Sequence, residues 1–573
     1  MTADIFDDAH LEILPARTQD GRARAQALRR ATGLVQQQTA MVEFSSRGRL
    51  LIVGDPEPAL AAARAVDELP ACVVVVPRGA PVAGDMSALP GVTVAKGEVR
   101  RLTGHLGQFT ATVEVDGDEF NLATLMDPGA DTFDLVLDLS AAPLMHQEIP
   151  PLGYYAPRGD ADALRAALSE LPELIGDFEK PKFFDYDPDI CAHGRSGLAG
   201  CTRCIDACPT LAIRSHGDKV EVDPHLCQGG GSCATACPSG AIRYAYPAMS
   251  DLLTGVRTAL HSYREYGGGK AAVLFYDAGT GARAFRTVAA SMPEWVLPFE
   301  IEEPGSIGMD AWLATLAYGA RQVLLLVTGS AAPSVLRELS LQLSYASALL
   351  EGLGFAGRRI QLLCDGERAA TALTRALEGL DDTAEIPPAG FAAFDEKRTT
   401  LGLALDHLYA HAPVPQPVAV LPEGAPFGEI RVDATACTLC MACVSVCPSK
   451  ALHDGGDRPA LRFVEGNCVQ CGLCHNACPE DAITLAPRVV YERAARGEMR
   501  VLHEEAAFRC VVCGKPFATQ KIIDRMMEKL SGHWMFQDEA ARRRLQMCED
   551  CRVMDMFEQG EPNVTDKPRA HEH

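Results

Sequence analysis

The sequence predicts an α/β multidomain protein with two small parallel-sheet units, two cysteine-rich modules and a C-terminal helical segment that carries four cysteines. Three observations predict this organisation. Short β-rich runs alternate with helical stretches in two parts of the chain. The 21 cysteines fall into tight groups instead of being spread along the chain. The length of 573 residues exceeds what a single hydrophobic core supports, and suggests three to five domains.

The first α/β unit is expected over residues 1–150. Apolar runs such as Val73 to Val76 alternate there with an alanine-rich stretch near Ala59 to Val66. The turn after the first strand keeps Gly54 but lacks the other glycines of the Gly-x-Gly-x-x-Gly fingerprint. We interpret this segment as a degenerate nucleotide-binding-like, Rossmann-like domain without its ligand. A working flavin or nicotinamide site is the alternative.

A second Rossmann-like unit is expected over residues 265–385. Strands near Ala272 to Tyr276, Val296 to Ile301, Val323 to Val327 and Ile360 to Leu363 alternate with helical segments, which predicts a parallel sheet. Residues 411–428 contain five prolines and are expected to be a linker that holds the next module at a distance.

The second cysteine module, residues 430–487, contains the run C-x2-C-x2-C-x3-C-P twice. In two-cluster ferredoxins three closely spaced thiolates bind one cubane and the fourth ligates the other cluster. We therefore predict two [4Fe-4S] clusters, held by Cys437, Cys440, Cys443 and Cys478, and by Cys468, Cys471, Cys474 and Cys447. The alternative, two zinc sites, fits poorly because zinc motifs rarely use this triple spacing with a trailing proline.

The first module, residues 180–246, departs from this pattern twice. Its leading cysteine, Cys191, stands ten positions before Cys201, and a glycine-bearing loop from His193 to Gly200 fills the gap. If the chain loops back, one cluster is held by Cys191, Cys201, Cys204 and Cys237. The alternative is that Cys191 is a free thiol. His193 and His475 stand beside cluster ligands and are expected to adjust hydrogen bonding there.

The second departure is Gly230, which occupies the place of a middle ligand. Only Cys227, Cys233 and Cys208 remain for that cluster. Three thiolates can hold a [3Fe-4S] cluster, or four irons with an outside ligand, and the site can also be empty. We expect its potential to differ from that of the other sites, because fewer thiolates bring less negative charge. Chain totals are therefore three to four [4Fe-4S] clusters, with a [3Fe-4S] cluster as the variant at this site.

The C-terminal group, within residues 505–560, consists of Cys510, Cys513, Cys548 and Cys551. Two C-x2-C knuckles suit one structural zinc. A single iron of the rubredoxin kind would use the same ligands. We favour zinc because a helical segment, Phe517 to Leu530, separates the knuckles and no aromatic packing is expected around them. Of the two cysteines outside all groups, Cys72 and Cys364, both are expected to be buried.

The charge balance excludes several classes of function. The net charge of -23 disfavours nucleic acid and anionic lipid as partners. The acidic start, Met1 to Asp8, does not resemble a secretory signal, and no apolar run reaches the roughly 20 residues of a transmembrane helix. Grouped cysteines indicate metal binding in a reducing compartment. We therefore expect a cytoplasmic protein without a transmembrane segment.

Both cysteine modules resemble bacterial-type two-cluster ferredoxins. The stretch from Trp295 to Leu363 is similar to the methyl-viologen-reducing hydrogenase delta subunit, although the loops 275–282 and 328–333 lack that family's cysteines. The domain order resembles subunits of heterodisulfide reductase systems. The segment from Cys191 to Cys204 and the C-terminal knuckles resemble large ferredoxin-type proteins associated with formate dehydrogenases and other molybdenum enzymes. The resemblance implies an electron carrier that serves a molybdoenzyme.

Three functions compete at this stage. The first is an iron–sulfur protein that relays electrons between redox protein partners, with cysteines as ligands, no catalytic residue and no flavin; it is more a carrier or an oxidoreductase subunit than a stand-alone enzyme. The second is a flavin-containing oxidoreductase subunit of the heterodisulfide reductase type. The third is a maturation factor for a metalloenzyme. Stoichiometric flavin would favour the second, and clusters that leave readily would favour the third.

Overall fold

The structure is a computed structural model that describes residues 12–34, 37–80, 91–115, 118–329, 331–355, 358–364, 369–377, 385–456 and 458–558. The acidic start of the chain, Met1 to Asp8, lies outside these residues. The chain forms two compact units. Unit 1 comprises Met1–Cys191 and Thr202–Gln416, and unit 2 comprises Ala192–Cys201 and Pro417–His573. The first cysteine module therefore contributes the loop Ala192–Cys201 to unit 2.

Unit 1 begins with a five-stranded sheet of order β4-β3-β2-β8-β9 in which every neighbouring pair is parallel. Its strands are β2 (Arg49–Val53), β3 (Ala71–Val76), β4 (Val92–Lys96), β8 (Leu135–Asp138) and β9 (Tyr154–Tyr155). Helix α3 (Pro56–Ala65) connects β2 to β3 and starts with proline at its first position, where the missing N–H costs nothing. Helix α5 (Ala161–Glu170) packs Ala167 into the same core as Leu50 and Ile52. The unit thus continues beyond residue 150.

Smaller antiparallel elements accompany this sheet. They are the three-stranded sheet β5-β6-β7 with helix α4, and the pair β1-β10. Their bounds are β1 (Met41–Ser46), β5 (Val99–Thr103), β6 (Thr110–Val115), β7 (Asp118–Asn121), α4 (Leu122–Met126) and β10 (Gly176–Pro181). The fully buried rings of Phe109 and Phe133 fill the core beneath β5 and β6.

The second parallel sheet of unit 1 has the order β18-β17-β19-β20. Its strands, which fall at the positions expected from the sequence, are β17 (Ala272–Asp277), β18 (Val296–Ile301), β19 (Gln322–Leu326) and β20 (Ile360–Leu363). The surrounding helices are α8 (Met249–Glu265), α9 (Thr280–Val288), α10 (Met309–Ala317), α11 (Pro333–Gly352), α12 (Ala369–Leu377) and α13 (Lys397–Ala410). Every described residue of α10 is buried, so this helix lies inside the domain.

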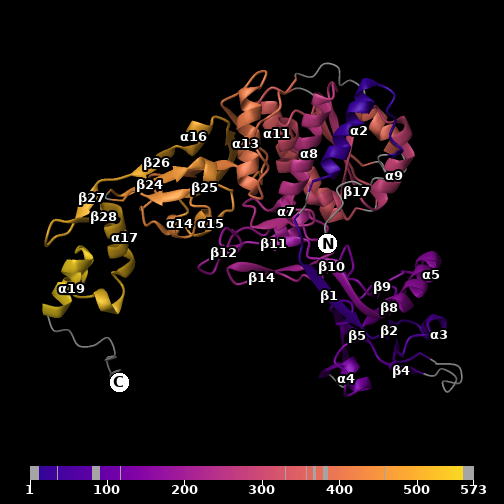
Figure 1. Cartoon of the computed structure of the whole chain (residues 1–573). Helices are drawn as coiled ribbons and strands as arrows, with labels where there is room; N and C mark the ends of the chain where they lie inside the picture. Colours follow the sequence, from indigo (N-terminus) through magenta and orange to yellow (C-terminus); the bar gives the residue numbers. More distant parts are fainter. Residues whose placement is uncertain are drawn as a thin grey trace, which may run out of the picture. The chain divides into compact units, whose positions relative to one another are not determined.

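Helix α2 (Gln19–Thr32) packs beside α8, as Figure 1 shows, although it precedes the N-terminal sheet in the chain. Its Arg24 is 1% exposed and donates hydrogen bonds to the carbonyl oxygens of Pro15, Pro293 and Val296. A buried guanidinium is tolerated because its donors are satisfied. Helix α2 therefore belongs with the second parallel sheet.

Outside the loop Ala192–Cys201, the first cysteine module consists of two short antiparallel pairs and two short helices. These are β11 (Phe184–Tyr186) with β16 (Ile242–Tyr244), β14 (Ile213–His216) with β15 (Lys219–Val222), α6 (Arg203–Asp206) and α7 (Ser232–Ala236). Cysteine side chains themselves form much of this module's core, together with Phe184, Ile213 and Ile242. A core made largely of thiols needs another component to fill and stabilise it.

Unit 2 contains the second cysteine module and the C-terminal segment. Its sheets are β21-β25-β22, β23-β24-β26 and the hairpins β27-β28 and β12-β13. The strands are β12 (Gly194–Arg195), β13 (Leu198–Ala199), β21 (Val418–Val420), β22 (Gly428–Val432), β23 (Leu452–Asp454), β24 (Ala460–Val464), β25 (Ile483–Val490), β26 (Met499–Glu504), β27 (Ala507–Arg509) and β28 (Pro516–Thr519). The helices are α14 (Ala442–Ser445), α15 (Leu473–Asn476), α16 (Arg493–Gly497), α17 (Gln520–Leu530), α18 (Glu539–Arg544) and α19 (Glu549–Glu558). The expected linker 411–428 contains β21, which pairs with β25, so it is not a bare spacer.

An ion network ties the sheets of the second module together. Arg488 donates two hydrogen bonds to the Glu465 carboxylate, at 2.9 and 2.8 Å. Arg500 Nη2 lies 2.8 Å from Glu465 and 3.0 Å from Glu429. The Glu465 side chain is 7% exposed, so its charge depends on these partners.

Replacing Glu465 by alanine is expected to destabilise the holoprotein by about 2–3 kcal/mol, because the arginines that face it lose their buried partner. The matched control is Arg431→Gln, which removes the ion pair between Arg431 and Glu429. The Arg431 side chain is 73% exposed, so this pair is expected to contribute only about 0–1 kcal/mol to stability. Thermal melting of both variants checks this. Equal shifts would show that the network contributes no more than an exposed pair.

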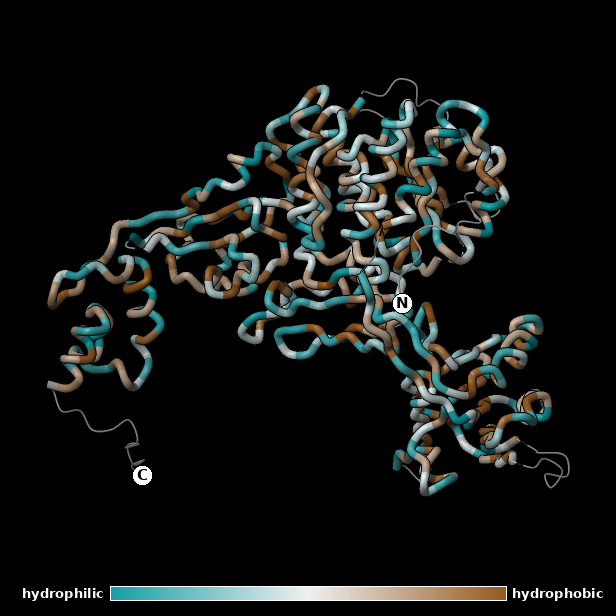
Figure 2. The backbone as a smooth tube through the Cα atoms, viewed as in Figure 1, coloured by the Kyte–Doolittle hydropathy of each residue, from teal (hydrophilic) through white to brown (hydrophobic). Residues whose placement is uncertain are grey.

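Apolar residues are interrupted by polar ones throughout the tube in Figure 2. In agreement, no helix in the described part of the chain combines the length and the apolar character needed to cross a membrane.

Candidate metal centres

Unit 2 brings the cysteines of the second module together in two groups. One small cavity is lined by Cys437, Cys440, Cys443 and Cys478, together with Leu461 and Ile483. Another is lined by Cys447, Cys468, Cys471 and Cys474, together with Phe463 and Leu473. The cysteines around each cavity are the two sets expected from the spacing, each with one cysteine from the other run.

Left-handed backbone shapes both loops. Leu439 and Met441 have φ of 56° and 61° and flank Cys440, and Gln470 and Gly472 have φ of 55° and 83° and flank Cys471. A positive φ is uncommon for leucine, methionine and glutamine. Alternating left-handed residues turn successive N–H groups toward one side, where they suit the negatively charged sulfur atoms of a metal–thiolate site. The backbone of both loops is therefore suited to hold a bound group between the cysteines.

Several polar groups donate to the sulfur atoms. The backbone N–H of Ala451 lies 3.3 Å from Cys447 Sγ, and that of Ala482 lies 3.3 Å from Cys478 Sγ. The Gln470 side chain donates to Cys468 Sγ at 3.3 Å. Hydrogen bonds to cluster sulfurs are among the factors that set reduction potential. The sequence spacing did not single out Gln470.

Burial makes these thiols hard to ionise in the absence of a cation. Burial and then neighbouring thiols raise the pKa of Cys443 to about 12, and they do the same for Cys471. Thiolate is the form that binds metal. A positively charged iron core between the cysteines would remove this penalty, so the residues present fit an iron–sulfur cluster in each group.

The loop Ala192–Cys201 packs on the second module. The Asn476 side chain of α15 donates to the Ala199 carbonyl at 2.8 Å. Gly200 lies against the buried Leu473, which a Cβ at position 200 would approach to 2.6 Å. Cys201 is also one of the neighbouring thiols that act on the pKa of Cys471. The ten-position gap before Cys201 thus serves a contact with α15.

The two histidines beside predicted ligands contact backbone carbonyls. His193 Nδ1 lies 2.9 Å from the Cys201 carbonyl oxygen, and His475 Nδ1 lies 2.7 Å from the Ile483 carbonyl oxygen. One ring nitrogen of each histidine is therefore engaged with the backbone, at Cys201 in one case and at the first residue of β25 in the other.

In unit 1, the remaining cysteines of the first module share one core: Cys191, Cys204, Cys208, Cys227, Cys233 and Cys237. Burial raises the pKa of Cys233 far above its usual value, and Cys227 and Cys208 raise it further. These are the three thiols left for the site that lacks a cysteine at position 230. Cys201, predicted as a ligand with Cys191, Cys204 and Cys237, belongs to unit 2 by its contacts.

The loop around Gly230 keeps the backbone geometry of a cluster loop. Gly229 and Gly231 have φ of 78° and 74°, like the residues that flank Cys440 and Cys471. A Cβ at position 230 would meet only the Pro209 ring, at 3.2 Å from its Cγ. Position 230 therefore lacks a thiol but not the conformation or the space of a ligand position.

The ends of the cysteine runs also repeat. Leu211, Gly240, Lys450 and Asp481 each stand three residues after the last cysteine of a run, and all have positive φ. Thr210, Ser239 and Ser449 place a hydroxyl 3.4 to 3.6 Å from the preceding Cys208, Cys237 and Cys447 sulfurs. The four runs thus share the left-handed residue, and three of them share the hydroxyl.

The C-terminal cysteines form a separate centre. The sulfur atoms of Cys510, Cys513, Cys548 and Cys551 all lie within 4.8 Å of one another. Burial acts to raise the pKa of Cys510, but backbone N–H groups, first that of Cys513, lower it to about 6. A hydrogen bond with Cys513 raises the pKa of Cys551 to about 12. The four sulfurs can all be thiolates only around a cation, and the set fits one tetrahedral metal ion.

Two expectations about this segment need correction. Phe517 packs against the buried Cys510 and Cys548, so aromatic packing is present. Its ring also meets that of Phe508 edge to face, at 5.9 Å between centroids. The predicted helix from residue 517 begins only at Gln520, because residues 516–519 form β28. The four sulfurs suit zinc and a single iron alike.

Replacing Cys513 by alanine is expected to remove about one zinc per chain and to leave the iron content unchanged. It should also lower the melting temperature of the C-terminal segment, because metal binding contributes to folding. Elemental analysis of the wild type and variant checks this. Iron in place of zinc, with the absorption of a mononuclear iron–thiolate centre, would identify the alternative.

The two cysteines outside all groups differ. Cys72 is buried in β3, as expected, and burial raises its pKa to about 12. Cys364, after β20, is exposed, so the expectation of burial was wrong. The residue follows the last apolar position of an edge strand, where the chain leaves the sheet.

Comparison with known families identifies both cysteine modules. Two family models, each described as a 4Fe-4S dicluster domain, match residues 179–241 and 436–483. No curated protein matches the chain. The chain therefore contains two 4Fe-4S dicluster ferredoxin domains, and such domains support iron–sulfur electron transfer.

Proposed function

We propose that this chain relays electrons between redox proteins through up to four iron–sulfur clusters, two in each cysteine module. The observation that carries the proposal is a repeated cysteine-loop design: all four runs have a left-handed residue three positions after their last cysteine, and three of the four also have left-handed residues on both sides of the middle position. Bound clusters would supply one-electron redox chemistry. The protein residues ligate, tune by hydrogen bonding and exclude water.

The loop Ala192–Cys201 supports a continuous relay. It joins Cys191 and Thr202 of unit 1 through the backbone, yet it packs on α15 of the second module. It also places Cys201 among the thiols that act on Cys471. We infer that electrons pass between the two modules by way of the clusters to which Cys201 and Cys471 belong.

A molybdoenzyme such as formate dehydrogenase is the partner we propose, on the resemblance of the segment from Cys191 to Cys204 and of the C-terminal knuckles. The two parallel-sheet domains would dock partners. The flavin-containing subunit remains an alternative that the flavin measurement below tests, and clusters that leave readily would favour the maturation factor instead.

The test is to measure iron, acid-labile sulfide, zinc and flavin after anaerobic purification, with electron paramagnetic resonance of the oxidised and reduced protein. We expect about fifteen or sixteen irons per chain and no flavin. Stoichiometric flavin would favour the catalytic subunit instead. Iron near eight would mean that the first module holds no clusters and would contradict the four-site relay.

A further inference from the structure

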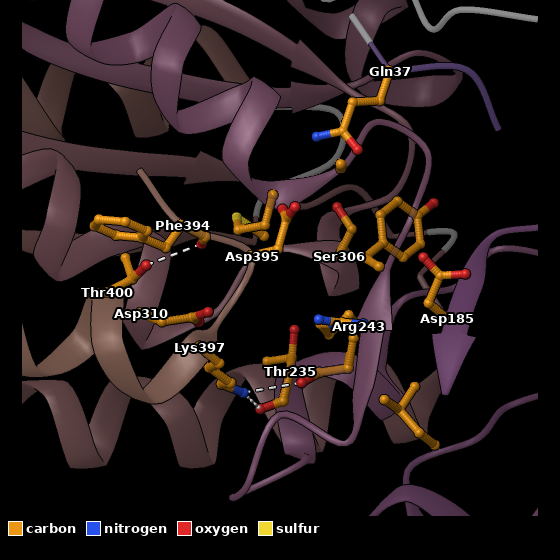
Figure 3. A pocket seen from close by; sticks show the side chains of 15 residues that line it. Gln37, Asp185, Thr235, Arg243, Ser306, Asp310, Phe394, Asp395, Lys397 and Thr400 are labelled. Atoms are coloured by element: carbon orange, nitrogen blue, oxygen red, sulfur yellow. Dashed lines mark hydrogen bonds between the residues drawn. The ribbon is translucent and has the colours of Figure 1, made fainter. Parts of the chain in front are cut away.

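Unit 1 contains a cavity of about 290 Å³ that no cysteine lines. Its wall combines the β11-β16 pair and α7 of the first cysteine module with η4 (Pro304–Ser306), the first turn of α10 and the start of α13. Figure 3 shows side chains from these segments converging on one space. The volume is close to the lower end of the range for small-molecule sites, about 300 Å³.

Asp310 is the buried charge of this cavity. It lies in the first turn of α10 and is 6% exposed. Its carboxylate makes no hydrogen bond or ion pair with any residue that the structure describes, and it points into the cavity in Figure 3. The positive end of α10 offsets part of the cost of burying this charge. Its oxygen atoms face the space of the cavity, where a ligand can donate hydrogen bonds to them.

Arg243 offers the opposite charge. It lies on β16, directly across from Asp185 of β11, and it likewise forms no ion pair with a described residue. In Figure 3 its guanidinium extends into the cavity from the side opposite Asp310. A guanidinium presents a planar fork of donors that matches a carboxylate.

Other polar groups of the wall are already engaged. Lys397 Nζ donates to the carbonyl oxygens of Ala234 and Thr235, at 2.9 and 2.6 Å. The Thr235 hydroxyl donates to the Gly305 carbonyl at 2.6 Å, and Asp395 accepts from the Ser250 N–H at 3.2 Å. These bonds fix the wall. They leave Asp310 and Arg243 to receive a guest, together with Asp185, whose exposed carboxylate lies on the strand paired with that of Arg243.

We propose that this cavity binds a small zwitterion of amino-acid size, whose ammonium group donates to Asp310 and whose carboxylate accepts from Arg243. Apolar wall residues, among them Ile242, Met249 and Phe394, would surround the rest of the molecule. This site is additional to the electron relay. It borders the relay, because α7 supplies Ala234 and Thr235 to the cavity and Cys233 to the cysteine core.

Calorimetric titration of the full-length, anaerobically purified protein tests the proposal. The probes are the twenty standard amino acids, each alone, with methylammonium and acetate as single-charge probes. We expect at least one amino acid to bind at one site per chain, with a Kd below about 1 mM. The single-charge probes should bind at least about tenfold more weakly, because each engages only one of the two groups.

Two variants assign the contacts. Asp310→Asn and Arg243→Gln should each weaken binding about tenfold or more, because each removes a charge-assisted hydrogen bond. Asp395→Asn is the matched control: it removes the same charge from the same wall, but its carboxylate already has a partner, and affinity should stay within about threefold.

Two results would overturn the proposal: no saturable heat from any amino acid with the wild type, or unchanged affinity in Asp310→Asn. Iron content and melting temperature, measured on every variant, show whether each is folded. The heats do not depend on electron transfer, so failure of this site and failure of the relay are distinguishable.

Discussion

Replacing Gly230 by cysteine is expected to abolish a three-iron resonance signal in the oxidised protein and to add about one iron per chain. The change restores a fourth thiolate beside Cys208, Cys227 and Cys233. The loop already has the left-handed geometry of the complete sites at Gly229 and Gly231. A Cβ at position 230 meets only Pro209, so the substitution requires a shift of a few tenths of an ångström.

The reduction potential should fall in this variant, because the added thiolate brings negative charge to the cluster. Redox titration followed by electron paramagnetic resonance measures both effects. Gly230→Ala is the control, since it introduces the same Cβ without a sulfur. An iron count and signal identical to those of the control would show that position 230 does not face the cluster.

The two glycines beside position 230 have no space for a side chain. A Cβ at Gly231 would come within 2.4 Å of Ser306 Cα, and one at Gly229 within 2.9 Å of the Phe183 ring. The Ser306 Cα is a backbone atom, and it cannot move aside as the end of a flexible side chain can. Position 230 is therefore the one place in the run Gly229–Gly231 where a side chain fits with little adjustment.

The cysteine groups could be predicted from the sequence because ligand spacing is a local property. The two cavities of the second module are each lined by four cysteines, and most of these lie a few residues apart in one short loop. The strands of the parallel sheets were predictable for a similar reason, since apolar runs such as Val323 to Val327 are signals within a few residues.

Contacts between distant segments had no such signal. Asn476 and Ala199 are separated by 277 positions, and nothing near Gly200 in the sequence indicates Leu473 as its neighbour. The packing of α2 on α8 also brings distant segments together, and so does the cavity that Arg243 and Asp310 both line. Leu439 and Met441 were missed for another reason, because their left-handed backbone is imposed by the loop and not favoured by their side chains.

Replacing Cys471 by glycine is the reciprocal change, and it is expected to convert a complete site into one with three thiolates. Cys471 occupies in the second module the position that Gly230 has in the first, between left-handed residues. Its sulfur lies beside those of Cys468 and Cys447, which raise its pKa after burial does. Bound iron should fall by about one atom per chain, and a second three-iron signal should appear on oxidation.

Electron transfer between the two modules should also slow in this variant, since the cluster near Cys201 would face an altered neighbour. Rapid-mixing reduction followed at cluster absorbance measures the rate, and the exposed Cys364→Ser is the control for loss of a thiol. Unchanged iron would show that Cys471 is not a ligand. A loss of about four irons would show that Cys471 is a ligand but that three thiolates do not hold a cluster. The Gly230 site would then be expected to be empty.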